Sequence, residues 1–159
     1  MTVRSLGENE VALYKSLRLR ALSSDPAGFG SSHARESAFD DDTWRSRLTG
    51  FAGRPGVVLI DMANDEAAGM VGVGEAERVG EAVVWGMWVS PDHRRSGIGR
   101  RLLAAAVDWA RDRSCTAVVL SVRDGNNAAG SLYRNAGFQE RGRQGDDETV
   151  LRFDLADPL

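Results

Sequence analysis

One short segment, between an apolar run that ends at Val89 and a helical pattern at 97–113, contains three arginines and two glycines. The segment reads Arg94-Arg95-Ser96-Gly97-Ile98-Gly99-Arg100, and it follows Val89, Ser90 and Pro91. A helix N-terminus has unpaired N–H groups and a partial positive charge, and glycines leave those groups unshielded. Arginine side chains add donors suited to phosphate oxygens. The segment therefore predicts a cradle for a diphosphate at the start of a helix.

Two common phosphate-binding loops do not fit this segment. A Walker A loop needs Gly-Lys-Ser/Thr, and the segment holds no lysine. A dinucleotide fingerprint needs three glycines, whereas residues 97–102 hold two. On these residues alone, a second interpretation remains: an ordinary strand–helix turn whose arginines are solvated.

A second block lies downstream, Asn126-Asn127-Ala128-Ala129-Gly130-Ser131-Leu132-Tyr133-Arg134-Asn135-Ala136-Gly137-Phe138. It contains the pattern Asn-x-x-Ala-x-x-Leu-Tyr-x-x-x-Gly-Phe. Together with Arg94-x-x-Gly97-x-Gly99, and in the same order, it resembles the two motif blocks of the GNAT superfamily of acyl-CoA-dependent N-acyltransferases. The resemblance covers residues 57–140 best, and the first helices are similar to those of a bacterial GNAT subgroup.

The resemblance implies acetyl-CoA as cofactor and gives roles to positions of this sequence. Backbone groups at 87–89 are expected to hold the thioester and pantetheine arm, and a β-bulge there would free an N–H for the thioester carbonyl. Asn126 would either bind the cofactor arm or cap its helix. Tyr133 would either protonate the leaving thiolate, as the catalytic acid, or pack in the core. The expected cofactor-binding residues are Met87, Trp88, Val89, Arg94, Arg95, Ser96, Gly97, Ile98, Gly99, Arg100, Asn126, Ala129 and Tyr133.

The sequence does not identify a general base. Some GNAT members carry a glutamate on one of two central strands, but the matching positions here are 83–85 and Ser121. Glu75, Glu77 and Glu81 lie on or near neighbouring strands. They would act directly or through water, or else be solvated charges at strand ends.

The acceptor side is bordered in the family by the N-terminal helices and the last hairpin. This points to Phe29, Ser31, Ser32, Glu36, Trp44 and Trp85. Acidic runs at 40–42 and 146–148 would attract a cationic amine, or would simply be solvated.

The expected function is direct transfer of an acetyl group from acetyl-CoA to a primary amine of a small molecule, peptide or protein. Cys115 stands at the start of a predicted buried strand and makes a poor nucleophile, so no acyl-enzyme is expected. The alternative is an acyl-CoA-binding sensor or regulatory domain with little turnover.

The elements that must position these residues form one predicted domain over residues 1–159. Apolar spacing predicts helices at 9–22, from an N-cap at Asp41 or Asp42, at 97–113 and at 127–135. Strands are predicted at 2–6, 57–62, 69–77, 82–90 and 116–122, with a hairpin from 138 to about 155. This order implies an α/β protein of the α+β type. Its mixed, mostly antiparallel sheet of six to seven strands would be flanked by about four helices.

Composition narrows the functional classes. The 159 residues carry a net charge of −3, which argues against nucleic acid as a partner. The lone Cys115 excludes an intrachain disulfide and a CxxC metal site, so no metal is expected. The first residues lack a signal-peptide pattern, and no apolar run approaches the ~20 residues of a membrane span. We therefore expect a cytoplasmic protein without a membrane partner. The resemblance to a bacterial GNAT subgroup implies a bacterial enzyme, and a homodimer stays open.

Glycine is frequent, at 18 residues, and several of the glycines fall within predicted strands. Gly69, Gly72, Gly74 and Gly86 lie in or beside these strands. Small residues there leave room for a ligand or for a bulge.

Overall fold

The computed structural model describes residues 3–155, so residue 2, the predicted start of the first strand, lies outside the described part. The helices are α1 (Val11–Ser24), α2 (His33–Ser37), α3 (Asp41–Leu48), α4 (Ile98–Asp112) and α5 (Asn127–Asn135). The strands are β1 (Val3–Ser5), β2 (Gly50–Phe51), β3 (Arg54–Ala63), β4 (Glu66–Glu75), β5 (Glu81–Val89), β6 (Ala117–Arg123), β7 (Gln139–Gln144) and β8 (Glu148–Asp154).

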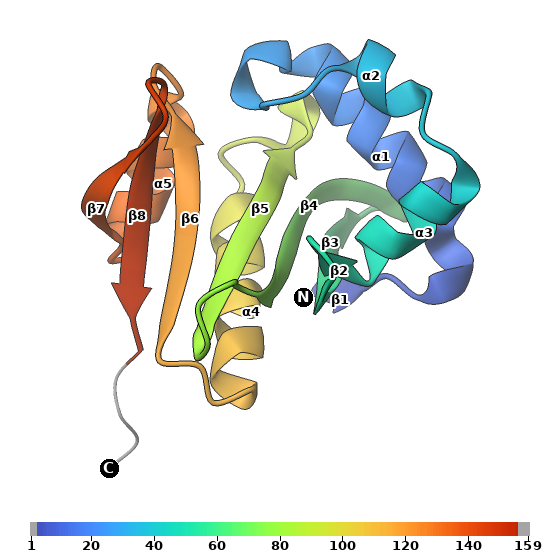
Figure 1. The fold of residues 1–159 in the computed structure, drawn as a ribbon. Coiled ribbons are helices and arrows are strands. Elements are labelled where there is room, and N and C mark those ends of the chain that lie inside the picture. The colour runs from blue at the N-terminus through green and yellow to red at the C-terminus, as the bar shows by residue number, and fades with distance from the viewer. Residues whose placement is uncertain (1–2, 156–159) are drawn as a thin grey trace.

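The strands form a mixed sheet in the order β1-β3-β4-β5-β6-β8-β7, and β2 pairs with β3 beside this path. Within the described residues β5 and β6 are the parallel pair, joined through α4, and the other pairs are antiparallel. Figure 1 shows the sheet with α4 and α5 against one face and α1 to α3 gathered over the β3–β4 end. The predicted α+β architecture with a mostly antiparallel sheet is confirmed.

Two apolar clusters hold these layers together, one on each side of the sheet. On one side, α4 buries a stripe at helical spacing, Leu102, Leu103, Ala106, Val107 and Ala110, against β4, β5 and β6. On the other side, residues of α1 and α3 pack against the alternate positions of β3 and β4. This alternation follows from the strand period of two, which sends successive side chains to opposite faces.

The N-cap of helix α3 lies one residue before Asp41, the earlier of the two predicted caps. The Asp40 carboxylate accepts the Thr43 N–H at 2.8 Å, so Asp40 is the N-cap and the predicted caps Asp41 and Asp42 stand in the first turn. Three successive aspartates offer the same capping chemistry, and only the backbone conformation selects one of them.

The hairpin of β2 and β3 was not predicted. Its two turn residues, Ala52 and Gly53, both have positive φ, at 52° and 80°, which is the geometry of a two-residue hairpin turn. Alanine rarely takes this conformation, so the sequence signal for the turn is weak. Strand β3 consequently begins at Arg54 and carries Pro55 within it, earlier than the expected start at residue 57.

Within residues 3–155, no helix has the length and apolar character to cross a membrane. The same residues contain no group of three or more His, Cys, Asp or Glu side chains that could hold a metal ion.

Candidate active site

Strand β5 carries a bulge near the middle of the sheet. In its pairing with β4, Gly72 lies opposite Trp85 and Met70 lies opposite Trp88, so Val71 faces both Gly86 and Met87. Gly86 has a φ of 64°, which a side chain would strain. A bulge takes a residue out of the hydrogen-bond ladder. The predicted bulge at 87–89 is therefore confirmed, and it starts one residue earlier, at Gly86.

Next to the bulge, β5 separates from β6. The two strands pair from Glu81–Ala117 to Val83–Val119, and no pairing follows within the described residues, although both strands continue. Figure 1 shows β5 and β6 diverging toward the end where β5 leads into the loop before α4. Among the described residues, the β6 side of β5 therefore has no ladder partner at residues 86–89.

The arginine–glycine turn opens α4 at the same end. Gly97 is the N-cap with a φ of 85°, and Arg95 also has a positive φ, of 64°. The Arg95 and Arg100 side chains are exposed and have no ion-pair partner in the described part of the chain. Ile98, predicted as a cofactor contact, turns its side chain into the core, so any such contact would be through its backbone. The turn thus presents a helix N-terminus between two unpaired cations.

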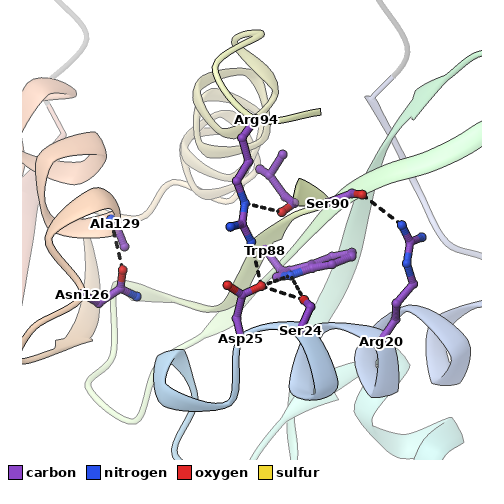
Figure 2. A network of polar contacts seen from close by, with 9 residues as sticks. Arg20, Ser24, Asp25, Trp88, Ser90, Arg94, Asn126 and Ala129 are labelled. Carbon is purple, nitrogen blue, oxygen red and sulfur yellow. Dashed lines mark hydrogen bonds and ion pairs between the residues drawn. The ribbon is translucent and has the colours of Figure 1, made fainter. Parts of the chain in front are cut away.

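Arg94 has a different environment from its neighbours. Its Nε donates to the Val89 carbonyl at 2.9 Å. Its Nη2 donates to the Asp25 carboxylate at 2.6 Å, as Figure 2 shows. Asp25 also accepts the Trp88 indole N–H at 2.8 Å. Burial raises the pKa of Asp25, but the hydrogen bonds from Ser24, Trp88 and Arg94 outweigh it and the pKa is lowered. Arg94 therefore ties the turn to the end of α1, and sequence reasoning missed Asp25.

The two motif blocks meet in space. A Cβ placed on Gly99 would lie 3.2 Å from Leu132 of α5 and 3.7 Å from Val89 of β5. Gly99 thus permits the close approach of α4 to α5, besides any contact with a ligand. The sequence expectation that these blocks build one site agrees with this packing.

Tyr133 is buried and packs on Phe138, with ring centroids 6.1 Å apart. No described residue hydrogen-bonds its hydroxyl. Burial raises the pKa of Tyr133 well above its ordinary value, so the hydroxyl is protonated at neutral pH. The tyrosine is a core residue that also retains a proton to donate.

Asn126 is the N-cap of α5, because its Oδ1 accepts the Ala129 N–H at 3.3 Å. This confirms the capping interpretation and leaves the side-chain Nδ2 for other contacts. A Cβ on Gly28 would lie 3.6 Å from that Nδ2, so the loop after α1 reaches the start of α5.

The three glutamates considered as bases lie at the wrong end of the sheet. Glu81 starts β5 and pairs with Arg152, Glu75 pairs with Arg113 at 3.7 Å, and Glu77 is exposed in the adjoining turn. Gly86 is five residues further along β5, about 17 Å at the rise of a strand. None of the three therefore contacts an amine at the bulge, and the prediction that they could act directly is wrong.

Glu36 lies nearer the bulge but is unsuited to accept a proton. It is fully buried, and Arg18 binds it through Nε at 2.9 Å and Nη2 at 3.0 Å, while Arg47 binds it at 2.9 Å. Burial alone would raise its pKa, but the ion pair with Arg18 and the charge of Arg47 lower the pKa to about 2. The carboxylate therefore acts as the counterion of two arginines.

The other expected acceptor residues divide between core and surface. Trp44 is fully buried beside Tyr14, and Glu36 is fully buried too, so neither of these residues, expected to border the acceptor side, is exposed. The Arg18 guanidinium stacks over Phe29 at 4.7 Å, and its Nη1 would lie 3.6 Å from a Cβ on Gly86. This places Arg18 and Phe29 beside the bulge.

Comparison with known proteins agrees with this geometry. The chain is 37% identical over 100 residues to an aminoglycoside N(6')-acetyltransferase type 1 from Klebsiella aerogenes, covering 58% of this chain and 66% of that protein. It is 40% identical over 60 residues to the ribosomal protein bS18-alanine N-acetyltransferase of Escherichia coli K12, covering 38% of this chain and 40% of that protein. The alignments thus span between two fifths and two thirds of these curated relatives.

The fold is shared with solved acetyltransferases. The PaiA N-acetyltransferase of Thermoplasma acidophilum, solved in complex with coenzyme A, superposes with a TM-score of 0.73 at 15% identity, covering 96% of this chain and 98% of that one. The profile of the acetyltransferase (GNAT) family matches residues 17–138, most of the chain. A bulged β5, a split from β6, and a glycine turn at the start of α4 thus occur in a chain that belongs to the GNAT acetyltransferase family.

Proposed function

We propose that this protein transfers an acetyl group from acetyl-CoA to a primary amine. The observation that carries the proposal is the convergence at one end of β5. The bulge at Gly86 and Met87, the Gly97 turn with exposed Arg95 and Arg100, and Tyr133 of α5 belong to elements that pack on one another there. Sequence and comparison lead to the same reaction class.

The residues at the turn fit a diphosphate. Gly97 leaves the first N–H groups of α4 unshielded, and Arg95 and Arg100 have no carboxylate partner among the described residues. Both features favour an anion. The thioester of acetyl-CoA supplies an activated acetyl group, which the backbone of residues 86–89 would orient within the split.

In the reaction the amine nitrogen forms a bond to the acetyl carbon and the carbon–sulfur bond breaks. One proton leaves the nitrogen and one reaches the sulfur. A backbone N–H at the bulge would stabilise negative charge on the carbonyl oxygen, which is the role of an oxyanion donor. Tyr133, held protonated by burial, would donate to the sulfur.

Loss of a proton from the amine needs no nearby carboxylate in this proposal. Arg18 lies beside Gly86, and its positive charge disfavours an ammonium group there. The amine would therefore arrive neutral or lose its proton to water. Cys115 takes no part, because burial and the charge of Glu75 raise the pKa of its thiol.

The test is release of free thiol from acetyl-CoA with a panel of amino acids, biogenic amines, aminoglycosides and peptides with free N-termini. We expect at least one class of amine to give saturable thiol release and an N-acetylated product by mass spectrometry. Saturable acetyl-CoA binding without any product would favour the alternative, a sensor domain. A cytoplasmic location fits a reaction that consumes acetyl-CoA.

A further inference from the structure

The loop that follows α1 starts beside the end of β5. Its first residue, Asp25, accepts hydrogen bonds from the Trp88 indole N–H at 2.8 Å and from Arg94 at 2.6 Å. Trp88 belongs to β5 and Arg94 to the turn before α4, and Figure 2 shows both side chains meeting the Asp25 carboxylate. The Ser24 hydroxyl donates to the same oxygen at 2.7 Å. Three donors from α1, β5 and the turn therefore hold this end of the loop.

A few residues further on, the same loop reaches β6 and α5. A Cβ on Gly28 would lie 3.6 Å from the side-chain nitrogen of Asn126, the N-cap of α5. A Cβ on Gly30 would lie 3.7 Å from Nη1 of Arg123, the last residue of β6. Residues 25–30, called the strap, thus extend from β5 to β6 at the end of the sheet where Figure 1 shows these two strands apart.

The strap and the pair α4 and α5 lie on opposite faces of the sheet at this point. The strap joins α1 to α2, and α1 packs on the face that carries Trp88. On the other face a Cβ on Gly99 of α4 would lie 3.2 Å from Leu132 of α5 and 3.7 Å from Val89 of β5. An extended ligand that follows β5 from the α4 turn to the bulge at Gly86 would therefore lie between the strap and these helices.

The strap offers backbone groups that can bind such a ligand. Phe29 is extended, with a φ of −126° and a ψ of 149°, and neither Phe29 nor Gly30 makes a backbone hydrogen bond within the described residues. The pantetheine arm of CoA contains amide groups, and extended backbone binds amide groups as an added strand would. The Arg18 guanidinium stacks on the Phe29 ring at 4.7 Å, which fixes this part of the strap.

We propose that the strap forms one wall of the binding site for the pantetheine arm of acetyl-CoA, and that Asp25 is the residue that positions it. This rests on the proposed use of acetyl-CoA as the acetyl donor. The backbone of Phe29 and Gly30 would hydrogen-bond the arm opposite the unpaired edge of β5. Asp25 does not contact the arm in this arrangement. It acts through Trp88 and Arg94, which hold the strap against β5.

The test compares acetyl-CoA with 3′-phospho-ADP, which keeps the diphosphate and lacks the arm. In isothermal titration of Asp25→Ala, we expect the Kd of acetyl-CoA to rise at least about tenfold relative to the Kd of 3′-phospho-ADP, the size expected for one or two lost hydrogen bonds. The ratio of the two Kd values removes the effect of the lost charge on the diphosphate, because both ligands carry it. An unchanged ratio would overturn the proposal.

Two further variants assign the effect to the contacts of Asp25. Asp25→Asn keeps an oxygen for the Trp88 N–H and should recover part of the ratio. Asp42→Ala removes an aspartate from an exposed position on α3 and should leave the ratio at its wild-type value. An equal change of the ratio in Asp42→Ala would contradict the role of Asp25.

Hydrogen exchange of the wild type tests the contact without any variant. Saturating acetyl-CoA should slow exchange of the Phe29 and Gly30 backbone N–H groups at least about threefold compared with saturating 3′-phospho-ADP, as expected for a hydrogen bond of ordinary strength. Equal exchange rates with the two ligands would show that the arm does not contact the strap.

Neither measurement requires an acceptor amine, so the strap and the proposed reaction are tested separately. A protein that shows the expected ratio and exchange but acetylates no amine would refute only the proposed reaction. A protein that acetylates an amine but exchanges residues 29–30 equally with both ligands would refute only the role of the strap.

Discussion

Replacing Glu36 by glutamine tests how the arginines of the acceptor side are held. The fully buried carboxylate binds Arg18 and Arg47, and glutamine keeps the shape but removes the charge. The variant leaves two guanidinium groups without a counterion in a low-dielectric layer between α1, α2 and α3. Breaking such a pair by removing one partner is strongly destabilising.

The magnitude follows from the lowered pKa. The pKa of Glu36 falls from 4.5 to about 2 in the folded protein. At ~1.36 kcal/mol for each pKa unit, this corresponds to about 3 kcal/mol of stability at pH 7. Because the folded pKa is the lower one, this stability is present above about pH 4.5 and is lost as the pH falls toward 2. At pH 3 only about 1 kcal/mol should remain.

Urea unfolding followed by circular dichroism at pH 7 and at pH 3 provides the measurement. The difference in free energy of unfolding between wild type and Glu36→Gln should shrink from about 3 to about 1 kcal/mol. Glu8→Gln, an exposed glutamate without an ion pair in the described residues, is the matched control and should leave stability unchanged at pH 7. A gap below ~1 kcal/mol at pH 7, or one independent of pH, would refute the reasoning.

Three further variants test other parts of the structure. Gly72→Ala puts a Cβ 2.1 Å from the Trp85 ring and should lower the free energy of unfolding, measured in urea, by ~1–3 kcal/mol. Gly142→Ala on β7, where the added Cβ meets open space, is the control and should leave it unchanged. Equal effects of the two substitutions would contradict the packing. Tyr133→Phe should lower kcat by ~10² with acetyl-CoA affinity kept, and an unchanged kcat would remove the tyrosine as acid. Asp40→Ala should lower the melting temperature, because α3 loses its N-cap, and an unchanged value would contradict that cap.

The local structure of the two motif segments was predictable because its signals lie within a few residues. Gly97 and Gly99 mark a helix start, and Asn126 marks another, by conformational rules that operate within a few residues. The same rules predicted α5 at its observed bounds, Asn127–Asn135. The mixed, mostly antiparallel character of the sheet also followed, since short connections favour antiparallel neighbours and a helical connection permits a parallel pair.

The acceptor side was less predictable because its contacts join residues far apart in the chain. Gly30 reads as a loop glycine, and only the fold brings it beside Arg123 of β6. Asp25 reads as a loop residue after α1, and only the fold brings it to Arg94, 69 positions away. Long-range ion pairs leave no periodic pattern in a sequence.

Glu36 is another residue whose environment depends on a partner far away in the chain. The sequence placed it at the border of the acceptor side, whereas the structure buries it fully against Arg18, 18 residues earlier. Arginine is abundant in this chain, and nothing in the local sequence selects Arg18 from the others. The partners of such buried charged residues therefore cannot be found from the local sequence alone.

Calorimetric titration of acetyl-CoA tests the central claim most directly, because the cofactor site carries the family's chemistry. The wild type should bind one equivalent saturably, and Gly97→Val should weaken binding at least about tenfold, since a side chain strains the positive φ and shields the N-terminus of α4. Gly145→Val, with a φ of 63° in the β7–β8 turn, controls for strain and should bind normally. The account would be contradicted if acetyl-CoA did not bind the wild type saturably, or if Gly97→Val bound it with the wild-type affinity.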